Sequence, residues 1–229
     1  DMEHRSSMDD EVDIRSEIVS HVPRVVLRTK VVVVGDEAVG KTSIVQSLVS
    51  SSGCPKQYWM TLGIDFSVKE VAVNSNVTVD LFLYTTGGQS IVNQRHDIMA
   101  TPIWAKANYI VCVYDIGSRV SFQNCSKWIE QVRSCSNSTT TASEVPCLLI
   151  GNKADFRNEL GNNNSRVEVT SDEARTYAQE HGLEYFECSA FLGEGVDLPF
   201  QYIANNWDAK NEAEGSSAPQ RIQGEFLSR

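Results

Sequence analysis

The sequence has little positive charge, and this limits the partners that the protein can bind. Its 20 lysine and arginine residues stand against 30 aspartate and glutamate residues, which gives a formal net charge of −10 at pH 7. A nucleic-acid backbone requires a basic face, so we expect no nucleic acid as the main partner. The same charge argues against docking on an anionic membrane through a basic patch.

Long apolar runs are also missing from the sequence. No stretch approaches the roughly 20 apolar residues that a membrane-spanning helix needs. The acidic first residues, DMEHRSSMDDEVDIRSE, lack the apolar segment of a signal peptide. No cysteine stands near the last residues, RIQGEFLSR, so we expect no direct lipid anchor.

Cysteine and histidine are scattered along the sequence. The six cysteines form no C-x-x-C pair, which argues against a zinc site. Cys112 and Cys147 fall inside apolar stretches, where a free thiol behaves as a small hydrophobic side chain. We therefore expect a reducing compartment such as the cytoplasm. The four histidines are far apart in the sequence, so we expect solvent exposure for them, not catalysis.

What the sequence does contain is an alternation of strand and helix patterns in a chain of one-domain length. Continuous β-branched runs such as VVLRTKVVVV predict strands that are buried on both faces. FSVKEVAV and VTVDLFLY, separated by residues 74–76, predict one hairpin. The whole pattern predicts an α/β domain with a mostly parallel sheet between helices, and a ligand at the carboxyl ends of the strands.

Several helix boundaries and one helix face can be read from the sequence. Ser121 is the expected N-cap of a helix through SFQNCSKWIEQVRSC, and Thr170 with Glu173 predicts a capping box. The final helix carries an apolar stripe at near-helical spacing. We expect it to pack on the sheet, with a partner groove as the alternative; the stripe consists of Phe200, Tyr202, Ile203 and Trp207.

The stretch GDEAVGKT, residues 35–42, matches G-x-x-x-x-G-K-[ST] and predicts a phosphate-binding loop. Lys41 would reach the β- and γ-phosphates, and the Thr42 hydroxyl would bind Mg²⁺. A tight glycine turn without a ligand is the alternative, but the buried strand before the loop and the helix after it favour a nucleotide. The expected contacts are Gly35, Asp36, Glu37, Ala38, Val39, Gly40, Lys41, Thr42 and Ser43.

A second motif, GNKAD at residues 151–155, predicts the base. Asp155 can accept hydrogen bonds from guanine N1–H and the exocyclic amine, which selects GTP over ATP. Asn152 can bond the base or tie neighbouring loops together, and the Lys153 stem can cover one face of the ring. In ECSA, residues 187–190, the backbone N–H groups of Ser189 and Ala190 can donate to guanine O6, or the segment is a plain strand end.

With these motifs, the stretches TLGIDF, TTGGQS and SFQNCSKWIEQV resemble the small GTPases of the Ras superfamily, Rab branch, over roughly residues 27–208. The resemblance implies a Ras-like P-loop G domain whose six-stranded sheet has one antiparallel strand and helices on both faces. It implies GTP or GDP and Mg²⁺ as cofactors. We expect an acidic N-terminal extension at residues 1–24, the G domain at 25–208 and a polar C-terminal tail at 209–229.

The resemblance also implies roles for residues in the two switch segments. Thr61 would contact the γ-phosphate and Mg²⁺, and Tyr58 would shield the phosphates. Gly88 would donate an N–H to the γ-phosphate, and Gln89, as the catalytic residue, would orient the attacking water. Trp59 and Met60 are either exposed partner contacts or locally packed side chains.

Some positions depart from the family pattern. Thr85 replaces the aspartate that holds Mg²⁺ through a water, so we expect weakened Mg²⁺ affinity. Glu37 stands where glycine or serine is usual, and its carboxylate would repel phosphate unless it turns to solvent. Ala38 replaces a glycine, which we expect to cost little, and Phe191 replaces the lysine of S-A-K. We therefore expect bound GTP and slow, weak GTPase activity.

A closer similarity is carried by LRTKVVVVGDEAVGKT, SFQNCSKWIEQ and the missing prenyl cysteine. These features resemble the Rab-like subunits of the intraflagellar transport B complex. That similarity implies the cilium or flagellum as the location, a heterodimer with a small β-sandwich intraflagellar transport subunit, and contacts with other B-complex subunits. The alternative is a cycling Rab-type GTPase switch in vesicle or protein trafficking.

Overall fold

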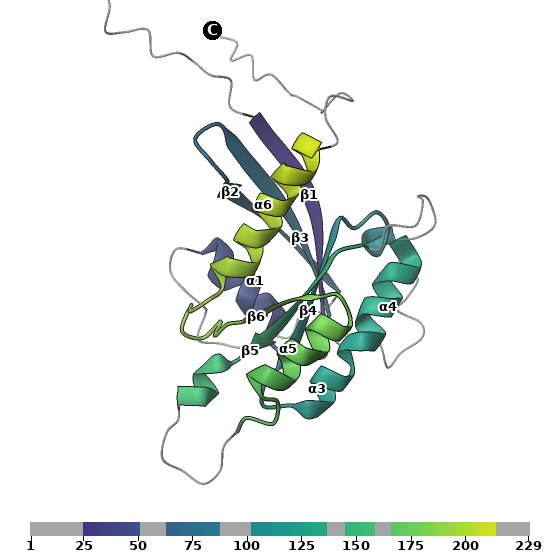
Figure 1. Ribbon diagram of the computed structural model, residues 1–229, viewed down its shortest axis with the longest axis vertical. Coiled ribbons are helices and arrows are strands. Elements are labelled where there is room, and N and C mark those ends of the chain that lie inside the picture. Colours follow the sequence, from purple (N-terminus) through teal and green to yellow (C-terminus); the bar gives the residue numbers. More distant parts are fainter. Residues whose placement is uncertain (1–24, 51–62, 88–101, 137–144, 159–165, 214–229) are drawn as a thin grey trace, which may run out of the picture.

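A six-stranded sheet in the order β2-β3-β1-β4-β5-β6 forms the centre of the protein (Figure 1). The computed structural model describes residues 25–50, 63–87, 102–136, 145–158 and 166–213. β2 runs antiparallel to β3, and every other neighbouring pair is parallel, as expected. The strands are β1 (Val25–Val34), β2 (Ile64–Ala72), β3 (Val77–Thr86), β4 (Tyr109–Asp115), β5 (Cys147–Asn152) and β6 (Glu184–Glu187).

Helices cover both faces of the sheet, which confirms the expected α/β architecture (Figure 1). Residues of α1 (Lys41–Val49) and α6 (Asp197–Ala213) share one apolar cluster with the sheet. The other face packs against α4 (Cys125–Ser136) and α5 (Ser171–Glu180). A short helix, α3 (Arg119–Gln123), comes directly before α4 in the chain. A 3₁₀ helix, η2 (Ala154–Asn158), follows β5.

The valine run in β1 explains why this strand lies at the centre. Its last residues are fully buried, and successive side chains point to opposite faces of the sheet. Val31 and Val33 belong to the cluster under α1 and α6, whereas Val32 and Val34 belong to the cluster under α4 and α5. A strand covered on both faces needs an unbroken apolar run, and the sequence supplies one.

The hairpin between β2 and β3 closes where it was predicted. Asn74 Oδ1 accepts hydrogen bonds from the backbone N–H groups of Asn76 and Val77, both at 2.9 Å. The Val73 N–H donates to the Val77 carbonyl at 3.0 Å. The asparagine side chain thus supplies the turn's acceptor, which is the usual reason for asparagine in such turns.

Two of the predicted helix starts were tested, and one was wrong. Ser118, not Ser121, caps α3, and its hydroxyl accepts the Ser121 N–H at 3.3 Å. Ser121 is buried instead, and its hydroxyl accepts the Asp115 N–H at 3.1 Å. Thr170 caps α5 as expected, accepting the Glu173 N–H at 3.2 Å.

The final helix packs as predicted. Phe200 and Ile203 are fully buried in the cluster on the α1 side of the sheet, and Tyr202 and Trp207 pack against its edge. The helix continues to Ala213, past residue 208 where we expected the G domain to end. Within the described ranges, no helix has both the length and the apolar character needed to cross a membrane.

Candidate nucleotide-binding site

The predicted motifs meet at one edge of the sheet. Residues 35–40 follow β1, residues 153–155 follow β5 and residues 188–190 follow β6. These strands are parallel, so their carboxyl ends lie at the same edge. β1 has β3 on one side and β4 on the other, so the strand order switches from one side of β1 to the other. Open α/β sheets bind ligands at such a topological switch point.

Two glycines shape the phosphate-binding loop because no side chain fits at either position. Gly35 has φ +140°, and a Cβ there would lie 2.1 Å from the Val113 carbonyl oxygen. Gly40 has φ +95°, and a Cβ there would lie 2.2 Å from Asn152 Nδ2. Gly40 is also the N-cap of α1, so the loop leads directly to the positive end of a helix.

Ala38 is strained, which corrects the expectation that alanine costs little here. Its φ is +60°, in the left-handed region, and its side chain is exposed. An L-residue with a Cβ costs about 1–2 kcal/mol in that region. At Ala38 the loop therefore adopts a left-handed backbone conformation that a glycine would adopt without this cost.

Lys41 is the charged centre of the loop. Its side chain is 6% exposed, and Nζ donates to the carbonyls of Gly35 at 2.9 Å and Asp36 at 2.7 Å. Burial lowers the pKa of Lys41 from 10.5 to about 8, although the Asp36 carboxylate opposes this shift. Within the described ranges, this buried ammonium donates to neutral carbonyls, so it would gain from a nearby anion and a phosphate fits this loop.

The Asp36 carboxylate has a second role that sequence reasoning missed. Trp128 Nε1 donates to Oδ1 and Asn124 Nδ2 donates to Oδ2, both at 2.8 Å. The signal was available, because Asn124 and Trp128 lie four residues apart in the stretch NCSKW and so share one face of the helix.

Asn152 ties two loops together, which settles one of its two expected roles. Its Nδ2 donates to the Val39 carbonyl at 2.8 Å, and its Oδ1 accepts the Ala190 N–H at 3.1 Å. The side chain is buried between the phosphate loop and the loop after β6. One asparagine thus aligns the part of the site expected to hold phosphate with the part expected to hold the base.

Lys153 is held by a residue that was not predicted to matter. Its Nζ pairs with Asp115 Oδ2 at 2.5 Å, and Asp115 Oδ1 accepts the Gly117 N–H at 2.8 Å. Lys153 also has φ +69°, a left-handed conformation. Asp115 ends β4 next to β5, and a carboxylate at a strand's carboxyl end was the sequence signal for it.

Asp155, the residue expected to select guanine, is oriented by the loop after β6. The Ser189 hydroxyl donates to Asp155 Oδ1 at 2.5 Å, and it accepts the Leu192 N–H at 3.1 Å. Asp155 is half-buried, whereas Phe191 is 75% exposed beside Ala190. The structure therefore brings together the residues of both base motifs, and their contacts with guanine stay a prediction.

The metal-binding side of the site is partly described. Thr85 is 1% exposed at the carboxyl end of β3, opposite Val33 of β1. Glu37 is exposed, and Thr42 and Ser43 are half-buried at the start of α1. Among the described residues, no group of three or more His, Cys, Asp or Glu side chains could hold a metal ion. Of the expected Mg²⁺ ligands, only the Thr42 hydroxyl therefore lies among the described residues, and phosphate oxygens would supply others.

The remaining predicted contacts lie outside the described residues. They are the switch residues Tyr58, Thr61, Gly88 and Gln89, together with Trp59 and Met60. Their expected contacts with the γ-phosphate, the metal and the attacking water stay predictions.

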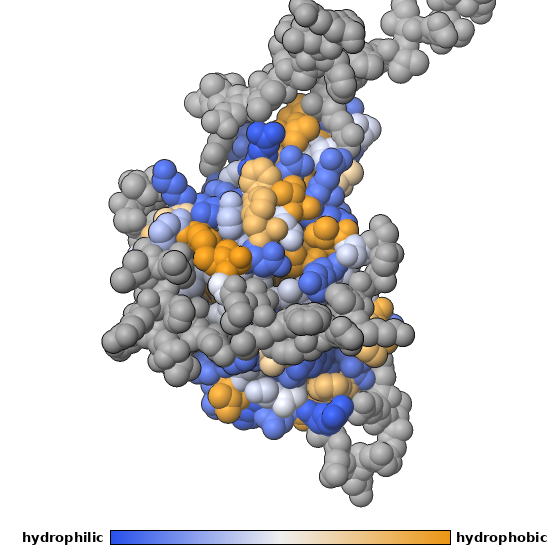
Figure 2. Space-filling view, turned by 180° about the vertical axis from the view of Figure 1, so that it is seen from behind, coloured by the Kyte–Doolittle hydropathy of each residue, from blue (hydrophilic) through white to orange (hydrophobic). Residues whose placement is uncertain are grey.

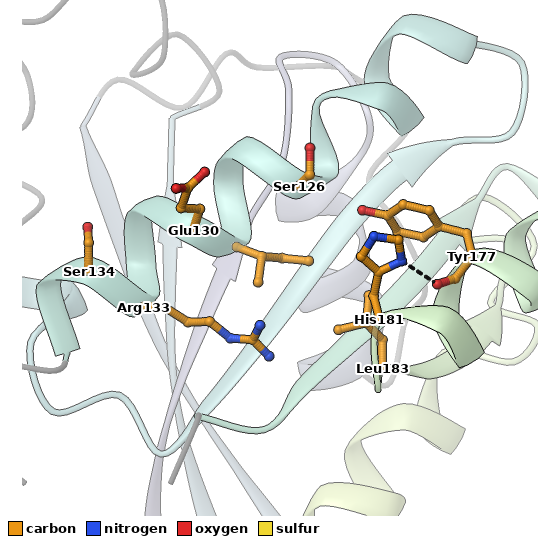
Figure 3. A pocket seen from close by; sticks show the side chains of 8 residues that line it. Ser126, Glu130, Arg133, Ser134, Tyr177, His181 and Leu183 are labelled. Atoms are coloured by element: carbon orange, nitrogen blue, oxygen red, sulfur yellow. Dashed lines mark hydrogen bonds between the residues drawn. The ribbon is translucent and has the colours of Figure 1, made fainter. Parts of the chain in front are cut away.

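A separate pocket of about 380 Å³ lies between α4 and α5 and contains none of these motifs (Figure 3). His181 stacks on Tyr177 with ring centroids 4.1 Å apart, and its Nδ1 lies 2.8 Å from the Tyr177 carbonyl oxygen. Ile129, Arg133 and Leu183 also line it. The candidate nucleotide site therefore rests on its motifs and their geometry and does not include this pocket.

Comparisons with known proteins agree with this geometry. Residues 30–209 match the Ras family. The chain is 33% identical over 182 residues to an intraflagellar transport protein 27 homolog of Trypanosoma brucei brucei, which covers 79% of this chain and 90% of the relative. It is 35% identical over 184 residues to the human homolog, with the same coverage. It is 31% identical over 191 residues to Ras-related protein Rab-1 of Theileria parva, covering 83% of this chain and 79% of that protein.

Proposed function

The chain belongs to the Ras family of small GTPases, and we propose on that basis that it is a GTP-binding subunit of the intraflagellar transport B complex with low intrinsic hydrolysis. Ras-family GTPases bind GTP or GDP together with Mg²⁺. The observation that carries the nucleotide-binding part of the proposal is the link made by Asn152, whose amide bonds both the phosphate loop and the loop after β6, and the similarity to intraflagellar transport protein 27 homologs supports the rest. The cilium or flagellum is the proposed location.

Two departures near the γ-phosphate support slow hydrolysis. Buried Thr85 is neutral, so the site lacks a negative charge that would favour Mg²⁺. Glu37 is exposed, yet it lies near enough to Lys41 to raise that lysine's pKa. A carboxylate so close to the loop disfavours additional negative charge. We therefore propose weak Mg²⁺ binding and a hydrolysis rate below the roughly 10⁻⁴ s⁻¹ of unassisted Ras.

An exposed apolar strand supports the proposed heterodimer with a small β-sandwich subunit. Ile64, Phe66 and Val68 alternate along β2, an edge strand, and are 37%, 52% and 43% exposed. The Phe66 ring lies 4.9 Å from that of Tyr84 on β3, centroid to centroid. Seen from behind, apolar side chains reach the surface between polar ones in the upper half of the molecule (Figure 2). An edge strand with such a face suits pairing with another sheet.

The test is a single-turnover assay with labelled GTP and no partner protein. The proposal expects loss of less than half the GTP over an hour at 25 °C. The variant Glu37→Gly, which removes the carboxylate, should hydrolyse GTP faster than the wild type. Turnover by the wild type as fast as that of an assisted GTPase would overturn the proposal.

The alternative is a cycling switch in vesicle or protein trafficking, whose partner affinity depends on hydrolysis. Measuring the affinity for the β-sandwich subunit with GDP and with a non-hydrolysable GTP analogue separates the two roles. Equal affinities agree with a constitutive subunit. A large preference for the GTP form agrees with the switch.

A further inference from the structure

We propose that Asp36, Asn124 and Trp128 form a latch that positions the phosphate-binding loop for the nucleotide. Asp36 is the second residue of the loop, whereas the other two belong to α4 and the turn before it. Both carboxylate oxygens of Asp36 accept a hydrogen bond at 2.8 Å, one from the indole and one from the amide. The latch thus joins segments about 90 residues apart in the sequence.

Each of the two donors in the latch also has a contact outside the loop. Trp128 is fully buried in the cluster under α4, so its ring cannot turn away, and its N–H needs an acceptor. Asn124 is oriented by Lys127, whose Nζ donates to Asn124 Oδ1 at 3.0 Å. That bond leaves the amide nitrogen of Asn124 facing Asp36.

The consequence for binding follows from the backbone of the same residue. The Asp36 carbonyl accepts Lys41 Nζ at 2.7 Å, so fixing the Asp36 side chain also fixes the backbone that holds the lysine. A loop held in its binding conformation loses less conformational entropy when it closes on phosphate. The charge-assisted bonds also offset the negative charge of Asp36, which would otherwise disfavour a phosphate. Asp36 is thus a positioning residue for the nucleotide.

The test exchanges the two groups of the latch, with labelled GDP as the probe. Asn124→Asp places two carboxylates against each other. We expect the GDP dissociation rate to rise about tenfold, which corresponds to about 1.4 kcal/mol. Adding Asp36→Asn restores a donor opposite an acceptor and returns the total charge to that of the wild type. The double variant should return to within about threefold of the wild-type rate.

A second variant keeps the packing and removes one hydrogen bond. Trp128→Phe retains a buried aromatic ring but no N–H, and we expect GDP dissociation to be about fivefold faster, since one charge-assisted bond contributes about 1 kcal/mol or more. Ser126→Ala, on the same helix but outside the latch, is the matched control and should leave the rate unchanged.

Thermal unfolding of the nucleotide-free variants separates positioning from structural support. Wild-type dissociation rates in all variants, or a double variant no better than Asn124→Asp, would overturn the latch even if unfolding temperatures fall. The inference rests on the proposed nucleotide binding. The assay does not depend on the proposed slow hydrolysis or on a partner, because its probe is GDP and it contains the protein alone. Fast GTP turnover would therefore defeat the slow-hydrolysis proposal without changing these rates.

Discussion

At the scale of the residue, Thr85 is the position on which our proposal of weak Mg²⁺ binding rests. It is buried at the end of β3, level with β1 just before the phosphate loop begins. A threonine hydroxyl can bond a water of the metal but brings no charge. We therefore propose that the site holds phosphate as other members of the family do but binds Mg²⁺ more weakly.

An aspartate at position 85 should strengthen Mg²⁺ binding. We predict that Thr85→Asp raises Mg²⁺ affinity in the presence of GDP about tenfold, or about 1.4 kcal/mol, because a buried negative charge is placed near the cation. Without Mg²⁺ the variant should melt at a lower temperature than the wild type, because the carboxylate is then unpaired. Mg²⁺ titrations of GDP release measure the affinity. The control is Thr78→Asp, equally buried at the far end of β3, which should lose stability and gain no metal affinity.

The buried ammonium of Lys41 makes nucleotide binding depend on pH. Burial lowers its pKa from 10.5 to about 8. At Lys41 the unfolded chain then holds more protons than the folded one across that range, so the contribution of this lysine to stability without nucleotide rises with pH from about 8 to 10.5. Bound polyphosphate favours the ammonium and raises its pKa again.

GDP binding at about pH 8.5 should therefore take up protons, and GDP affinity should fall as pH rises above about 8. Calorimetry in two buffers of different ionisation enthalpy measures the uptake. Equal apparent enthalpies in the two buffers at that pH would contradict this account of Lys41. Lys41→Arg, whose side chain does not titrate, should show much weaker pH dependence.

At the scale of the element, the two faces of α6 differ in burial. Phe200 is fully buried against the sheet, whereas Leu198, two residues earlier, is 61% exposed. We predict that Phe200→Ala lowers the free energy of unfolding by about 3–5 kcal/mol, through lost burial and the cavity left behind. Leu198→Ala should change it by less than about 0.5 kcal/mol. Urea denaturation of both variants checks the pair, and similar losses would mean that α6 packs differently.

The elements themselves could be predicted because their patterns are local. The β1 valine run, the Asn74 turn and the Thr170 cap each depend on neighbours in the sequence, and each is confirmed. Ser121 was misassigned because two serines three residues apart can both cap a helix. Only the fold decides that Ser118 does so while Ser121 is buried beside Asp115.

The parts of the site that could not be predicted are contacts between distant elements. Asp115 pairs with Lys153 across neighbouring strands, and Asp36 bonds Trp128 of α4. Residue type at one position does not determine such pairs, because the sheet order brings the partners together. Motif spacing therefore predicted which loops form the site, but not which side chains hold those loops in place.

At the scale of the whole molecule, a bound nucleotide would join loops that follow β1, β5 and β6. The protein itself bridges them through single side chains such as Asn152 and Ser189. A ligand at 100 times its dissociation constant adds about 2.7 kcal/mol to the stability of the folded state. GTP could thus stabilise the surface presented to a partner without being consumed, which is the role that we propose.

The most direct test of that role is to identify the nucleotide that purified protein carries. Protein prepared with Mg²⁺ is denatured, and the released nucleotide is separated and quantified, with Lys41→Ala prepared in parallel. Our account predicts near-stoichiometric guanosine nucleotide, mostly GTP, in the wild type and little in the variant. Wild-type protein that carries no nucleotide, or a variant that retains as much as the wild type, would contradict it.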